Sequence, residues 1–89
     1  MKITKTTQEK LEAAFKAIGY KIRYEKGTFK SGYCLIEEQK VVVVNKFYPL
    51  ESKVIAMAEI MRELNPDNTG LDDTLVKIIT EVLKSQTNP

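Results

Sequence analysis

Four consecutive valines, Val41–Val44, constrain the fold of this chain of 89 residues more than any other segment does. β-Branched residues favour strands, and successive strand residues point to opposite faces of a sheet. A strand with one solvated face alternates apolar and polar residues, whereas this run presents valine to both faces. We therefore expect either a central strand that is covered on both faces or a strand whose second face meets another chain.

The length predicts one α+β domain over residues 1–84, since single cores typically contain about 50 to 200 residues. The polar residues 85–89 are expected to form a disordered tail. A chain of this size buries only about two thirds of its unfolded surface on folding. The surface of a partner would therefore add useful stability.

Three segments have the apolar period of amphipathic helices. The first covers about residues 7–18, and Thr6 and Glu9 at its start have the spacing of a capping box. The second begins near Pro49, because the fixed φ of proline suits a first helical turn. The third covers about residues 72–84.

Between the first two helices the apolar period changes to two, which indicates strands. These strands are expected at about residues 20–25, 29–37 and 41–45. Because short connections favour antiparallel neighbours, we expect a three-stranded antiparallel meander with the two C-terminal helices packed on it. The expected order of elements is α-β-β-β-α-α.

The chain contains no histidine and a single cysteine, Cys34. These counts exclude histidine zinc sites, Ser-His-Asp and Cys-His catalysis, an internal disulfide and a multi-cysteine metal site. Cys34 lies in an apolar strand and is expected to be a buried structural residue. The sequence therefore predicts a protein that is not an enzyme, with no catalytic residue, cofactor or metal.

The basic residues are concentrated in the first third of the chain. Residues 1–30 carry eight basic and three acidic side chains, whereas residues 31–89 carry six basic and nine acidic ones. This asymmetry makes nucleic-acid binding through residues 20–33 and the N-terminus an alternative function. The candidate contacts with nucleic acid or another anion are Lys21, Arg23, Lys26 and Lys30.

A protein–protein interaction or self-associating module is the function that we expect first. A sheet with helices on one side buries one face only, and the second helix has an unusually broad apolar arc. The candidate interaction surface is Val42, Val44, Phe47, Tyr48, Met57 and Met61. The expected partner is a second copy of the chain, as a homodimer, or another protein. The alternative is a monomer in which three helices cover both faces of the sheet.

Residues 19–27, 32–34 and 43–46 carry a resemblance to an uncharacterised family of short bacterial proteins of unknown function. The resemblance covers about half of the chain, from Ala17 to Leu64. It implies no activity, because none is assigned to that family.

A weaker similarity is to the hairpin-helix unit of small zinc metallopeptidases, in which a strand leads to a helix bearing His-Glu-x-x-His. The corresponding stretch here is residues 58–62, where Glu59 remains but Ala58 and Arg62 replace the two zinc ligands. Without imidazoles there is no zinc site and no activated water. The similarity implies a catalytically dead metallopeptidase-like scaffold.

The chain has no apolar run near the length of about 20 residues that a membrane helix needs. Its N-terminus lacks the apolar stretch of a signal peptide. We therefore expect a cytoplasmic protein without a membrane partner.

Overall fold

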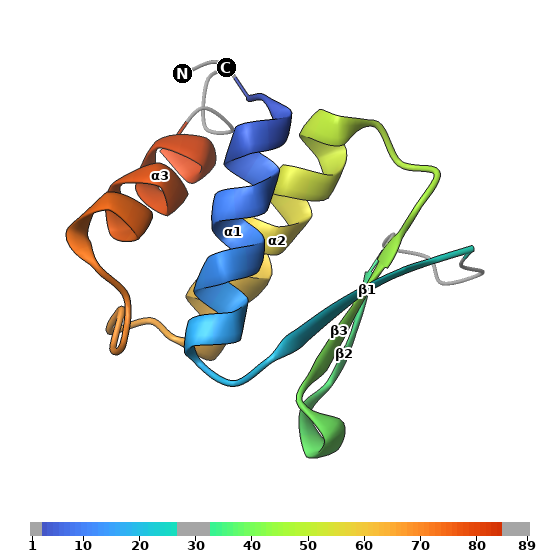
Figure 1. Cartoon of the computed structure of the whole chain (residues 1–89), viewed down its shortest axis with the longest axis horizontal. Helices are drawn as coiled ribbons and strands as arrows, with labels where there is room; N and C mark the ends of the chain where they lie inside the picture. The colour runs from blue at the N-terminus through green and yellow to red at the C-terminus, as the bar shows by residue number, and fades with distance from the viewer. Residues whose placement is uncertain (1–2, 27–32, 85–89) are drawn as a thin grey trace.

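The computed structural model describes residues 3–26 and 33–84. Within them the helices and strands are α1 (Lys5–Ala17), β1 (Lys21–Glu25), β2 (Tyr33–Ile36), β3 (Val41–Asn45), α2 (Leu50–Leu64) and α3 (Asp73–Lys84), with a short 3-10 helix, η1 (Glu37–Gln39), before β3. Figure 1 shows α1, α2 and α3 on the same side of the sheet. The expected α+β class is confirmed, and so is the position of β3.

The antiparallel meander is wrong. The strand order is β1-β3-β2, so that β3 lies in the centre, antiparallel to β2 but parallel to β1. The expectation that consecutive strands are neighbours holds for β2 and β3, which η1 joins closely. It fails for β1, because the valine run takes the one position with a strand on each side. Residues 29–32 of the expected second strand lie outside the described residues.

Helix α1 begins one residue after Thr4, two residues earlier than expected. The hydroxyl of Thr4 accepts from the Thr7 amide at 3.4 Å, and the hydroxyl of Thr7 accepts from the Thr4 amide at 3.2 Å. This reciprocal capping box replaces the expected box from Thr6 to Glu9. At the other end Gly19 follows α1 with φ of 87°, the left-handed conformation that its missing Cβ permits.

The two C-terminal helices do not both pack on the sheet. α2 contacts β3, whereas α3 packs against α1 and α2 on the side away from the sheet (Figure 1). α2 begins after Pro49, as expected, and α3 begins after Asp72, whose side chain accepts a hydrogen bond from the Leu75 amide at 2.9 Å.

The core lies between the sheet and the helices α1 and α2, and it continues between these two helices and α3. Its buried residues are Leu11, Ala14, Phe15, Val42, Val44, Val54, Met57, Ala58, Ile60, Met61, Ile79 and Val82. The other two valines, Val41 and Val43, point to the sheet face without helices, yet each is only 8% exposed. In the register of the sheet, each lies between a residue of β1 and a residue of β2, namely Val41 between Lys21 and Ile36 and Val43 between Arg23 and Cys34. Little of the valine run therefore reaches solvent.

Candidate functional site

The strand β1 lies at an edge of the sheet, with β3 on one side. At the start of β1, the amide of Lys21 donates to the carbonyl of Lys40 at 2.9 Å. At its end, the carbonyl of Glu25 accepts from the amide of Lys46 at 3.0 Å. Both bonds join β1 to the ends of the central strand, so these residues direct their backbone groups toward β3.

Backbone groups of successive strand residues point to opposite sides of the strand. Those of Ile22 and Tyr24 therefore point away from β3, to a side where no strand of the described residues pairs with β1. At Tyr20 the amide on this side donates to the carbonyl of Phe15 at 2.9 Å, so the end of α1 closes the edge there. The open edge thus begins after Tyr20.

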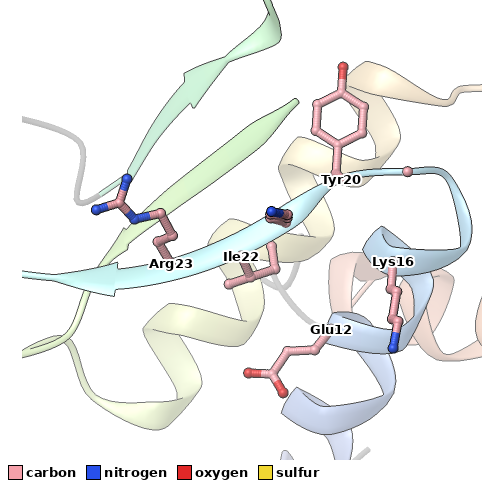
Figure 2. A pocket seen from close by; sticks show the side chains of 7 residues that line it. Glu12, Lys16, Tyr20, Ile22 and Arg23 are labelled. Carbon is pink, nitrogen blue, oxygen red and sulfur yellow. The ribbon is translucent and has the colours of Figure 1, made fainter. Parts of the chain in front are cut away.

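A cavity of about 620 Å³ lies beside this edge. Its lining residues are Glu12 and Lys16 of α1, Gly19, Tyr20, and Lys21, Ile22 and Arg23 of β1. Figure 2 shows the side chains of Ile22 and Arg23 leaving β1 on opposite sides. Lys21, Ile22 and Arg23 of β1 therefore form one wall of the cavity. The helix α1 forms the other.

The position of β1 is fixed by the hydroxyl of Tyr24. This hydroxyl donates to the carboxylate of Glu12 and accepts from the side-chain amide of Gln8 at 2.8 Å, so it joins β1 to α1. It also lies 3.8 Å from the sulfur of Met57 on α2, and the ammonium of Lys53 lies 5.4 Å from the centre of the Tyr24 ring. Burial raises the pKa of Tyr24 well above its usual value, and the Glu12 carboxylate raises this pKa further.

The charges around the edge are mixed. The cavity is lined by Lys16, Lys21 and Arg23 and by the single acid Glu12. On the sheet face without helices, Arg23 forms an ion pair with Glu25. That face of β1 therefore presents Lys21, Arg23 and Glu25 in sequence, with opposite charges at its two ends.

The structure does not place the candidate interaction surface at the surface. Val42, Val44, Met57 and Met61 are fully buried. The broad apolar arc of α2 arises because this helix contacts β3, α1 and α3 at once. Of the two remaining residues, Phe47 is 67% exposed beneath the Lys46 ammonium, and Tyr48 is half-buried.

The candidate nucleic-acid contacts are more exposed. Lys21, Arg23 and Lys26 are at the surface, and Lys30 lies outside the described residues. Two aromatic rings of residues 20–33, Tyr20 and Tyr24, are half-buried and pack against the core, whereas Phe29 and the side chain of Tyr33 lie outside the described part of the chain. Neither Tyr20 nor Tyr24 is positioned to stack an unpaired base.

The metallopeptidase-like stretch lies on α2. Ala58 is buried, whereas Glu59 and Arg62 are exposed. Among the described residues no group of three or more His, Cys, Asp or Glu side chains could hold a metal ion. The side chain of Cys34, expected to be buried, lies outside the part of the chain whose side chains are described.

The edge of β1 was missed by the sequence reasoning because that reasoning considered side chains and not backbone groups. The feature of the sequence that indicates this edge is the valine run. A strand with apolar residues on both faces is typical of the centre of a sheet, and it leaves the alternating strand at residues 20–25 as an edge. The exposed charges Lys21 and Arg23 are also typical of an edge strand.

Comparison with known proteins adds no family: no family model, no curated protein and no solved structure matches the chain. Both resemblances noted from the sequence thus remain expectations. Within residues 3–26 and 33–84, no helix has the length and hydropathy needed to cross a membrane.

Proposed function

We propose that this chain is a non-enzymatic protein-interaction module that accepts an extended segment of polypeptide as an additional strand at β1. The observation that carries the proposal is the outer side of β1, where Ile22 and Tyr24 direct backbone donors and acceptors away from β3. Unpaired donors and acceptors at a sheet edge can pair with another chain, and the charges of β1 restrict which chain fits.

The site has the two features that strand addition needs. Main-chain hydrogen bonds supply affinity, and the space between strand and helix receives the side chains of the added segment. Here the edge groups belong to Ile22 and Tyr24, and the adjoining cavity of about 620 Å³ is bounded by α1. The bonds from Tyr24 to Gln8 and Glu12 hold the edge in place before binding, which reduces the ordering cost.

The other candidate functions have less support. Nucleic-acid binding through residues 20–33 needs exposed rings as well as cations, whereas Tyr20 and Tyr24, the two rings of this segment that the structure describes, pack against the core. A metallopeptidase-like ancestry at residues 58–62 would not alter the proposed binding mode. We retain the cytoplasm as the expected compartment, because a chain with one cysteine suits a reducing environment.

The proposal is tested with peptides selected against the protein from a random-peptide display library. A selected peptide, added to the isotope-labelled protein, is expected to slow hydrogen exchange at the amides of Ile22 and Tyr24. The amide of Lys21, already bonded to the Lys40 carbonyl, serves as the internal control and should change little. Peptides that bind while leaving both outer amides freely exchanging would contradict the proposal.

A further inference from the structure

We infer that the strand added at β1 is β1 of a second copy of this chain, paired antiparallel about a two-fold axis at Arg23. The inference rests on the proposed function, because it fills the same edge, and it names the partner. Three features of β1 support it: the positions of its outward backbone groups, the order of its charges and the open space beside it.

The outward backbone groups have the symmetry that such a dimer requires. Ile22 and Tyr24 point away from β3 and lie one residue on either side of Arg23. A two-fold axis at Arg23 therefore places Ile22 of each copy opposite Tyr24 of the other. In an antiparallel ladder each such pair exchanges both of its backbone hydrogen bonds. The two sheets then form one continuous sheet across the axis.

The charges on the face without helices are self-complementary in this register. Lys21 and Glu25 lie two residues on either side of the axis, so each Lys21 lies opposite Glu25 of the second copy. Opposite charges directly across two strands stabilise the pairing. The two Arg23 side chains meet at the axis, and the ion pair of each with its own Glu25 reduces their repulsion.

The neighbouring antiparallel registers fit less well. An axis at Ile22 would place Lys21 opposite Arg23 of the second copy, and like charges across strands are destabilising. An axis at Tyr24 would also bring opposite charges together, Arg23 with Glu25 of the second copy. However, it would pair Ile22 with Lys26, beyond the end of β1, and would leave Lys21 without a partner in β1. Only the axis at Arg23 pairs every residue of β1 with a residue of β1.

The helix side of the edge has room for the second copy. The cavity separates Glu12 and Lys16 of α1 from the edge itself, so α1 does not fill the space that an added strand needs. An acidic peptide is the alternative occupant of the edge. Its carboxylates would pair with Lys16 and Lys21, but they would also lie beside the carboxylate of Glu25 and repel it.

Sedimentation equilibrium of the full chain and of charge variants tests the inference. The wild type should form a dimer, and Lys21→Glu and Glu25→Lys should each raise the dimer Kd about tenfold, because two opposite-charge pairs become like-charge pairs. The double variant Lys21→Glu/Glu25→Lys should restore the Kd to near that of the wild type. Lys77→Glu and Glu59→Lys make the same changes at exposed positions on α3 and α2 and should leave the Kd unchanged.

A wild type that remains monomeric up to about 100 µM, a concentration that populates any dimer of micromolar Kd, would overturn the inference. So would a double variant that dimerises as poorly as the single ones. If such a monomer still protects Ile22 and Tyr24 on binding a display-selected peptide, strand addition stands and only the second copy is wrong. If no peptide protects them, the proposed function fails as well.

Discussion

The hydroxyl of Tyr24 donates a hydrogen bond to the carboxylate of Glu12, and this bond joins the edge strand β1 to α1. An edge strand has a neighbouring strand on one side only, so side-chain bonds contribute more to its position than they would in a central strand. Gln8, from the preceding turn of α1, donates to the same hydroxyl. The open edge and the helix wall of the cavity are thereby held together.

Removing this hydroxyl should weaken the fold measurably. Tyr24→Phe leaves the ring in place but removes the bonds to Gln8 and Glu12, and we expect a loss of about 1 kcal/mol in the free energy of unfolding. Chemical denaturation measures the loss. Tyr48→Phe is the control, because among the described residues the Tyr48 hydroxyl makes no hydrogen bond, and it should change stability by less than about 0.5 kcal/mol. Equal losses in the two variants would contradict the role given to Tyr24.

The same residue predicts a pH dependence. Because the pKa of Tyr24 is raised in the folded state, folding favours the protonated phenol. The contribution is complete below the unfolded-state pKa of about 10 and is lost progressively as the pH rises above it. Denaturation of the wild type and of Tyr24→Phe across this range should therefore show their difference in stability shrinking above about pH 10. A stability difference between the two proteins that grows with pH would contradict a raised pKa of Tyr24 in the folded state.

The buried valines should act within one chain. Val44→Ala removes about two methylene equivalents from a fully buried site on β3, and we expect a loss of about 2 kcal/mol, independent of protein concentration. Phe47→Ala is the control, since Phe47 is largely exposed, and it should cost less than about 0.5 kcal/mol. A loss of stability relative to the wild type that shrank as the protein concentration rose would instead place Val44 at an interface between chains.

The like-charge contact at the proposed two-fold axis gives a prediction of opposite sign to the charge reversals. Arg23→Thr removes the two cations that meet there and introduces a residue that favours strands, so the dimer should become tighter by about threefold. Analytical ultracentrifugation measures the change. Weaker dimerisation of this variant would show that Arg23 attracts the partner. That behaviour is expected if an acidic peptide, and not a second β1, occupies the edge.

The sequence predicted well those features that depend on local patterns. The apolar period located all three helices within about two residues, and Pro49 marked the start of α2 through its own backbone preference. The strand Val41–Asn45 was located correctly because β-branched residues strongly favour strands. In each case the deciding interactions lie within a few residues of one another.

Features that depend on distant contacts were predicted less well. Parallel pairing of β1 with β3 joins strands separated by β2, and no local pattern in β1 records it. Met57 and Met61 gave a broad apolar arc that was interpreted as a surface, but the arc is buried because α2 has neighbours on several sides. The edge of β1 was missed because it consists of backbone groups, which every residue has and which become a site only through their surroundings.

The most direct test of the account is residue-by-residue hydrogen exchange along β1 in solutions dilute enough to contain only monomer. Lys21, Arg23 and Glu25 direct their amides toward β3, whereas Ile22 and Tyr24 direct theirs to the open edge. The account predicts slow exchange at the first three and fast exchange at the other two, with the fast pair becoming slow as the concentration rises. Slow exchange at Ile22 and Tyr24 in the monomer would show that the edge is already occupied and would contradict the account.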